Sequence, residues 1–168
     1  GAVPGPRHPH SAPPSDSCGR FFAPGAGSDP RAYNRPPRYR EAKAGTKYNE
    51  METGTFSFHT NVPVLIAEGT DEKINIPVDV VILPLNAKSG DLPVLIEAKS
   101  AGDFTNVNKR RKEEATKMQQ LKNTYGVAVS YSLFLCGYFD SGYLGYEAAE
   151  GIDWIWEHRI SDLNQLGI

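Results

Sequence analysis

The sequence predicts one α/β or α+β domain, in which a mixed β-sheet forms the core and helices flank it. Two observations carry this prediction. Short runs of β-branched and aliphatic residues recur from residue 48 onward, and one longer segment between them has the period of a helix. The chain has 168 residues, of which 39% are hydrophobic, and this suits a single core of ordinary size.

The N-terminal segment, residues 1–46, has a different composition from the rest of the chain. It is dense in Pro, Gly, Ser and Arg and shows no apolar periodicity. Such a segment cannot bury enough surface to offset the entropy of ordering it. We therefore expect a disordered tail or linker there, followed by a folded domain over residues 47–168. An arm that binds phosphate through its arginines is the alternative.

The expected strands are apolar segments bounded by turn residues. Pro84 to Asp91 has the composition of a turn, and it separates the two strongest strands. These two strands are rich in Val and Ile, which favour β-structure. In chain order, the expected strands are Asn61–Ala67, Ile74–Leu83, Leu92–Lys99, Val127–Cys136 and the short segment Ile152–Glu157.

One long helix is expected over Thr105–Tyr125. Met118, Leu121 and Tyr125 recur at helical spacing and define its apolar face. A short terminal helix is expected over Ser161–Leu166. The Tyr- and Gly-rich segment from Gly137 to Gly151 is expected to pack around the edge of the sheet, rather than to contact DNA or a partner subunit.

The two strongest strands fit a hairpin centred on Lys88. In this register one face of the hairpin is apolar on both strands, and a slip of one residue would set an apolar row against a mixed row. The alternation therefore favours this register. Its apolar pairs are Val78 with Ala98, Val80 with Ile96, and Ile82 with Val94.

The other face of the hairpin brings ionisable side chains together. Asp79 lies opposite Glu97 in this register, and Lys99 shares the face because it follows Glu97 by two residues. Cβ atoms of opposite residues lie roughly 4.5–5.5 Å apart. Two carboxylates this close repel each other unless a cation lies between them.

These residue types fit a magnesium site. The carboxylates of Asp79 and Glu97, with a backbone carbonyl such as that of Ala98, are the hard oxygen ligands that Mg²⁺ prefers. Charged Lys99 cannot be a ligand, but it can position the attacking water and help to deprotonate it, or stabilise the transition state of phosphate chemistry. A purely structural ion cluster, with Lys99 paired to Glu97 or Asp79, is the alternative.

Two motifs resemble a known family. Pro77-Val78-Asp79 followed by Glu97-Ala98-Lys99 resembles the PD-(D/E)xK nuclease superfamily, although Val78 separates the Pro and Asp that are adjacent in the tight form. Downstream, IEAKSAGDFTNVNKRRKEEATKMQQLKNTYG and FLCGYFDSGYLGYEAAEGIDWIWEHRISDL are similar to the C-terminal half of XamI-type type II restriction endonucleases. The likeness runs from about residue 47 to the end.

The resemblance implies a restriction-endonuclease-like fold and sequence-specific, Mg²⁺-dependent cleavage of double-stranded DNA in a restriction–modification system. It implies that Asp79 and Glu97 hold the metal and that Lys99 serves the attacking water. A short palindromic target would call for a homodimer. The superfamily often adds further residues near the site, and the candidates here are Glu50, Glu52 and Gln119.

Basic residues gather at the start of the long helix. Residues 109–122 hold six basic and two acidic side chains in a chain whose net charge is −2. This local excess favours contact with DNA phosphates. A solvated helix face, with intrahelical pairs such as Arg110 with Glu114, is the alternative. The residues expected to contact DNA are Lys109, Arg110, Arg111 and Lys112.

Several other classes of function find no support in the sequence. His59 and His158 are isolated, and neither zinc spacing nor a Ser-His-Asp arrangement nor a Gly-rich phosphate loop appears. There is no apolar run of membrane-spanning length and no secretory signal, so a cytoplasmic prokaryotic location without membrane contact is expected. A repair or recombination nuclease of the same fold and an inactive DNA-binding fragment remain as alternative functions.

Overall fold

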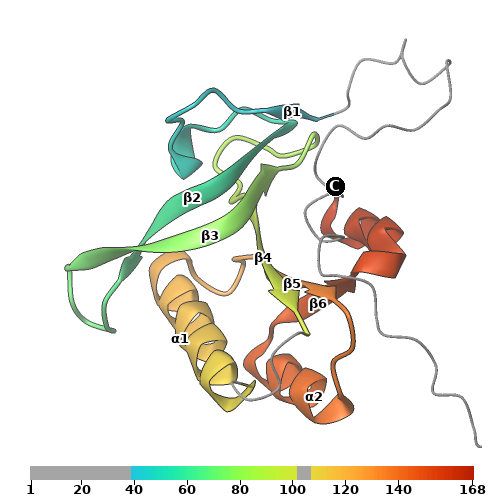
Figure 1. The fold of residues 1–168 in the computed structure, drawn as a ribbon. Coiled ribbons are helices and arrows are strands. Elements are labelled where there is room, and N and C mark those ends of the chain that lie inside the picture. Colours follow the sequence, from blue (N-terminus) through green and yellow to red (C-terminus); the bar gives the residue numbers. More distant parts are fainter. Residues whose placement is uncertain (1–38, 102–106) are drawn as a thin grey trace, which may run out of the picture.

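The computed structural model describes residues 39–101 and 107–168. They form a six-stranded sheet in the order β1-β2-β3-β4-β5-β6, with helices packed against it (Figure 1). Strands β2, β3 and β4 pair antiparallel, whereas β1 with β2, β4 with β5 and β5 with β6 pair parallel. The mixed sheet with flanking helices confirms the predicted fold class.

The strands are β1 Arg40–Glu41, β2 Thr55–Leu65, β3 Lys73–Leu83, β4 Val94–Ser100, β5 Tyr131–Cys136 and β6 Asp153–Trp156. The α-helices are α1 Val107–Tyr125 and α2 Ser141–Glu150. Two 3₁₀ segments complete the described elements, η3 Tyr48–Glu50 and η5 Glu157–Leu166.

Two buried clusters lie on the two faces of the sheet. One contains Met118 and Leu121 of α1 together with Tyr143 of α2, so both α-helices cover this face. The other is covered by partly buried side chains of η5, including Leu163 and Leu166. The sheet is thus enclosed on both faces, with α1 and α2 side by side on one of them (Figure 1).

The predicted register of β3 and β4 is confirmed where the two strands pair. Val80 pairs with Ile96, and Ile82 with Val94. The ladder stops before Val78, so the expected pair of Val78 with Ala98 does not form. Val78 instead belongs to the cluster under α1, whereas Val80 belongs to the opposite cluster. The prediction that side chains alternate strictly between the two faces along this strand is therefore wrong, because the alternation shifts by one residue at Asp79.

The face change in β3 is matched in β2. Phe58 packs against the cluster under η5, but Val62 belongs to the cluster under α1. The ladder between the strands pairs Phe58 with Val80 and Thr60 with Val78, and His59, which lies between, has a φ of 50°. A left-handed residue in a strand rotates the chain relative to its partner, and this explains the change of face.

Other boundaries differ from the expectations. Arg40–Glu41 joins the sheet as β1, although it falls within the segment 1–46 expected to be disordered; residues 1–38 lie outside the described part. The segment Gly137–Gly151, to which no helix was assigned, contains α2. Its N-cap Asp140 accepts a hydrogen bond from Tyr143 N, and Gly151 ends it with a φ of 77°.

The C-terminal helix was predicted over Ser161–Leu166. The structure has a 3₁₀ segment there, which begins earlier, at Glu157, and is kinked at Arg159. None of the helices in the described ranges is both long and apolar enough to cross a bilayer.

Candidate active site

Asp79 lies on β3 at the point where pairing with β4 stops. Its Oδ2 accepts a hydrogen bond of 2.9 Å from the backbone N of Ala98, so the side chain takes the place of a backbone acceptor in the ladder. Its Oδ1 lies 3.9 Å from Nδ1 of His59 on β2. The Asp79 side chain is 38% exposed. This carboxylate is therefore anchored to β4 but open to solvent.

Glu97 and Lys99 lie two residues apart on β4 and share the face covered by α1. The Nζ of Lys99 is 3.2 Å from Oε1 of Glu97. The same oxygen is 2.8 Å from Nζ of Lys117 on α1. The other oxygen, Oε2, is buried and has no hydrogen-bond partner among the described residues. Glu97 thus has one oxygen that contacts two ammonium groups and one buried oxygen without a hydrogen-bond partner among the described residues.

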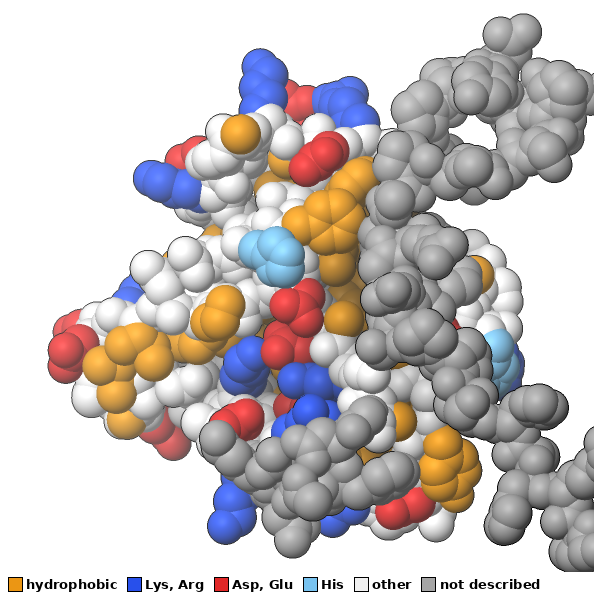
Figure 2. Space-filling view, in the orientation of Figure 1, with side chains coloured by type: hydrophobic (Ala, Val, Ile, Leu, Met, Phe, Trp, Pro, Cys, Tyr) orange, Lys and Arg blue, Asp and Glu red, His pale blue; other side chains and the backbone are white. Residues whose placement is uncertain are grey.

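The structure brings Asp79, Glu97 and Lys99 to one region, where β3 and β4 separate under α1. Asp79 is bonded to the amide of Ala98, which directly follows Glu97 in the chain. Lys117 spans both strands, because its Nζ also lies 3.3 Å from the carbonyl oxygen of Pro77 on β3. Figure 2 shows the acidic side chains in the centre of this face, between a histidine and a group of Lys and Arg side chains.

Two residues of this region were not singled out from the sequence. Lys117 was counted only in the basic run, and Glu114 was considered only as a partner of Arg110 in the alternative of a solvated helix face. Glu114 is 1% exposed, and its Oε1 lies 3.1 Å from Nζ of Lys99. Its Oε2 accepts a hydrogen bond of 2.8 Å from the Tyr143 hydroxyl of α2. The spacing of three residues between Glu114 and Lys117, which places both on one helix face, was the available signal.

The ammonium of Lys99 lies between two carboxylates. Burial works against its charge, but the negative charges of Glu97 and Glu114 outweigh burial and raise the pKa of Lys99 above its ordinary value. Lys99 is therefore charged at neutral pH. In this state it orients and stabilises negative groups but cannot take up a proton.

Glu147 of α2 lies behind Glu114 and is fully buried. Burial first, and then the negative charge of Glu114, raise the pKa of Glu147 to about 8. Glu147 is thus neutral at pH 7. The pKa of the Tyr143 hydroxyl is also raised, by burial and by Glu114, so this phenol remains a hydrogen-bond donor.

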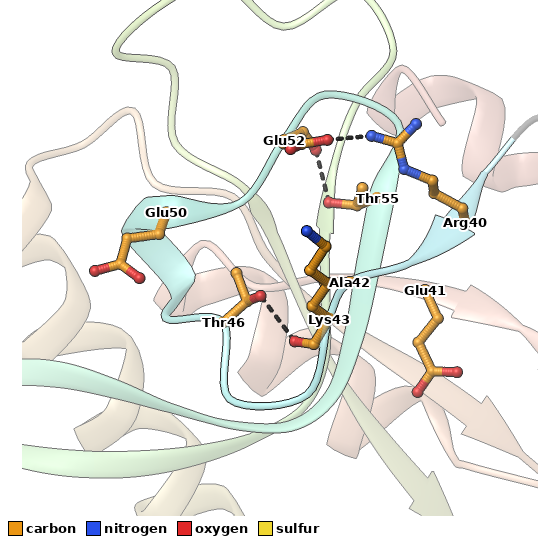
Figure 3. Close-up of a pocket in the computed structure, with 8 residues that line it drawn as sticks. All are labelled: Arg40, Glu41, Ala42, Lys43, Thr46, Glu50, Glu52 and Thr55. Atoms are coloured by element: carbon orange, nitrogen blue, oxygen red, sulfur yellow. Dashed lines mark hydrogen bonds and ion pairs between the residues drawn. The ribbon is translucent and has the colours of Figure 1, made fainter.

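Glu50 and Glu52 do not join the site. Both line a pocket beside β1 (Figure 3). There Glu52 is paired with Arg40, and Oε1 of Glu50 lies 3.8 Å from Nζ of Lys47. The adjoining Gly54 is bonded to Leu83, at the end of β3 and roughly 13 Å along the strand from Asp79. The structure therefore does not bring either upstream acid to Asp79.

Gln119 also points elsewhere. Its Nε2 donates to Oδ1 of Asn123, 2.8 Å away, and the side chain is exposed. It follows Lys117 by two residues, which is about 200° around a helix. Lys117 and Glu114 therefore occupy the helix face that was expected to carry Gln119.

The basic residues at the start of α1 have different surroundings. Arg110 donates to the carbonyl oxygen of Ser100, 3.1 Å away, rather than pairing with Glu114 as in the alternative of a solvated helix face. The guanidinium of Arg111 lies 5.5 Å from the ring centres of both Tyr143 and Tyr146. Lys112 is exposed. The side chain of Lys109 lies outside the described part.

The donors around Asp79 and Glu97 are oxygens, the ligand type that Mg²⁺ prefers. Within the described ranges no group of three or more His, Cys, Asp and Glu side chains is placed to hold a metal. A site here would therefore depend on two carboxylates and backbone oxygen. The unpaired, buried Oε2 of Glu97 needs a positive partner, because a buried acceptor without one is costly.

Comparisons with known proteins point to one family. The family model described as XamI restriction endonuclease matches residues 35–156. The type II restriction enzyme SalI of Streptomyces albus G is 62% identical over 124 residues, which make up 74% of this chain. They make up 38% of that enzyme, so the chain spans well under half of its relative's length.

One solved structure shows a distant likeness. Protein VC1899 of Vibrio cholerae is 15% identical, with a TM-score of 0.38. The likeness covers 68% of this chain and 26% of that protein.

Proposed function

Since this chain belongs to the XamI restriction endonuclease family, we propose that it carries the catalytic centre of a type II restriction endonuclease. The family match confirms the resemblance to XamI-type restriction endonucleases. The proposed reaction is hydrolysis of phosphodiester bonds in double-stranded DNA at a defined sequence, as part of restriction–modification in a prokaryotic cytoplasm.

The observation that carries this proposal is the arrangement around Glu97. One oxygen of this buried carboxylate contacts two ammonium groups, and the other has no partner among the described residues. Both oxygens of Glu147 also lack a partner, so what distinguishes Glu97 is its place next to Ala98, whose amide binds Asp79. The open oxygen, beside a solvent-accessible Asp79, supports a site that receives a cation.

In the proposed site Asp79, Glu97 and the carbonyl of Ala98 hold Mg²⁺. When bound, the ion would supply a positive charge that polarises the scissile phosphate and lowers the pKa of the attacking water. Asp79 is fixed for this task by its hydrogen bond to Ala98. Glu97 is fixed by Lys117, which leaves its second oxygen free.

Lys99 is proposed to act on the water and the phosphate. Its ammonium is held at the site in the charged form, so it can orient the attacking water and stabilise charge that develops on the phosphoryl oxygens. The water oxygen forms the new bond to phosphorus and releases its proton to solvent, while the bond to the leaving oxygen breaks and that oxygen takes up a proton from solvent.

The start of α1 is proposed to bind the DNA backbone. Arg110, Arg111 and Lys112 come soon after the strand that carries Glu97 and Lys99 in the chain, and their positive charges would attract DNA phosphates. Lys109 is proposed to join them from its place in the sequence. A palindromic target would be bound by a homodimer, with one catalytic centre for each strand.

Cleavage of a mixed-sequence duplex tests the proposal directly. Wild-type protein, Lys99→Met and the control Lys88→Ala would be assayed with Mg²⁺ and with a chelator. Lys88 is a suitable control because its side chain is exposed in the turn between β3 and β4. We expect discrete fragments that need Mg²⁺, are lost in Lys99→Met and remain in Lys88→Ala. Folded wild-type protein that binds DNA but never cuts it would support the DNA-binding alternative and refute the proposal.

A further inference from the structure

We propose that Glu114 is a positioning residue that holds the ammonium of Lys99 in place for catalysis. This inference rests on the proposed nuclease function. Glu114 comes from α1, whereas Lys99 comes from β4, and their charged groups are 3.1 Å apart. Glu114 is 1% exposed, and its two oxygens face Lys99 and Tyr143.

The burial of Glu114 requires an explanation. An ionised carboxylate loses its hydration when it is buried, and this cost is several kcal/mol unless partners replace the water. Here the partners are the ammonium of Lys99 and the hydroxyl of Tyr143, which donates to Oε2 at 2.8 Å. Glu114 is therefore held both by its own helix and by α2, so it offers Lys99 a rigid support.

Glu114 is also the partner of Lys99 that has no other proposed task. Glu97 contacts Lys99 at 3.2 Å, but it is shared with Lys117 and is the proposed metal ligand. A lysine tied to Glu97 alone would compete with the metal for the same carboxylate. With Glu114 on its other side, Lys99 keeps a fixed position while Glu97 serves the metal.

A merely structural ion pair would give a different result on mutation. Removing the charge of Glu114 would then lower stability but leave the cleavage rate of the folded protein unchanged. Glu147 provides a comparison for the loss of an ion pair, because it is another fully buried glutamate that interacts with Glu114, yet no ion pair joins it to Lys99 in the described ranges. Its carboxyl group is already neutral at pH 7, so Glu147→Gln changes little charge.

The first test compares Glu114→Gln with Glu147→Gln at a temperature where both remain folded. Single-turnover cleavage would be measured with Mg²⁺, and the Kd for duplex DNA with Ca²⁺. We expect Glu114→Gln to slow cleavage by roughly 100-fold, as small displacements of catalytic groups do, with an unchanged Kd. Glu147→Gln should stay within about 3-fold of the wild-type rate. Equal rates in the two variants would overturn the proposal.

The second test does not depend on cleavage. Denaturation midpoints would be measured for Lys99→Met, Glu114→Gln and the double variant. Lys99→Met alone leaves Glu114 buried and unpaired, so adding Glu114→Gln should recover stability rather than lose more. Additive losses would show that the two groups are not coupled and would overturn the inference. If folded wild-type protein never cleaves DNA, the nuclease proposal fails, and this cycle still decides whether Glu114 holds Lys99.

Discussion

Lys99 and Lys117 contact the same oxygen of Glu97, at 3.2 and 2.8 Å, while the second oxygen has no partner in the described part of the chain. Glu114 supplies a further negative charge to Lys99. Two ammonium groups thus balance two ionised carboxylates in the buried layer, and Asp79 remains outside this balance at the surface. The negative charge of Asp79 is the one that remains, and a cation that binds a phosphate would neutralise it.

Glu147 gives this balance a dependence on pH. Its pKa is raised from 4.5 to about 8 in the folded protein, so the folded state keeps a proton that the unfolded chain releases. This contribution to stability is complete below pH 4.5 and is lost as the pH rises toward 8. We expect the denaturation midpoint of the wild type to fall between pH 5 and pH 8.

The Glu147→Gln variant is the control for this prediction. Its amide cannot ionise, so the midpoint should change less over the same pH range, when both proteins are measured in urea at constant ionic strength. Parallel pH profiles of wild type and variant would show that another group is responsible.

At this scale the sequence could predict the strand residues of the site but not the helix residues. Asp79, Glu97 and Lys99 follow from alternation along two apolar strands, and the structure places all three in one region. Glu114 was missed: its spacing from Lys117 was a signal, but its burial depends on α2, which was not recognised in a segment rich in Gly and Tyr. The catalytic roles of Asp79, Glu97 and Lys99 stay predictions.

At the scale of elements, the site exists because β3 leaves its partner. Residues Val80 to Ile82 of β3 pair with β4, and the two strands separate at Asp79, just before them in the chain. The carboxylate of Asp79 accepts a hydrogen bond from the amide of Ala98 instead. His59 on β2 has a left-handed φ of 50° opposite this point. Such a conformation costs a non-glycine residue on the order of 1 kcal/mol or more. The local distortion is what turns Asp79 toward β4 and solvent.

Alternation along the strands predicted the register of β3 and β4 but could not predict this distortion. The hydrophobic pattern is satisfied on both sides of Asp79, because the sheet is buried under α1 on one face and η5 on the other. A strand that is apolar on both faces has no polar row to mark a change of face. The face predicted for Val78 was therefore wrong, although the faces predicted for Val80 and Ile82 were right.

The end of β5 provides a test of how tightly this region is packed. Gly137 has a φ of 93°, and a Cβ added to it would lie 2.9 Å from the Cβ of Ala101, which follows β4. The substitution Gly137→Ala therefore combines backbone strain with a steric clash. We expect it to reduce the free energy of unfolding by about 1–3 kcal/mol.

Urea denaturation checks this prediction, with Gly145→Ala as the control. Gly145 lies within α2, and a Cβ there would meet no atom within 4 Å. Alanine favours a helix interior, so Gly145→Ala should leave stability unchanged or raise it slightly. A loss of equal size in both variants would contradict the packing argument.

For the molecule as a whole, acidic and basic side chains follow one another along the chain in an order that suits phosphate chemistry. The chain has a net charge of −2, yet six basic side chains fall within residues 109–122, directly after the strand that carries Glu97 and Lys99. This local excess of positive charge would attract the proposed negative substrate to a chain that is otherwise acidic. This asymmetry could be predicted from the sequence, since it depends only on where the charged residues lie along the chain.

A divalent cation should stabilise the folded protein if the acidic pair is a metal site. A ligand that binds only the folded state raises its stability by mass action, and Asp79 with Glu97 has no such geometry in an unfolded chain. We expect millimolar Mg²⁺ or Ca²⁺, added at constant ionic strength, to raise the Tm by roughly 2–5 °C. The rise should disappear in Glu97→Gln and persist in Glu50→Gln, because Glu50 is exposed and faces Lys47 beside β1. The same rise in all three proteins would place the bound ion away from the strand ends, and the site would then be an ion cluster that only stabilises the sheet.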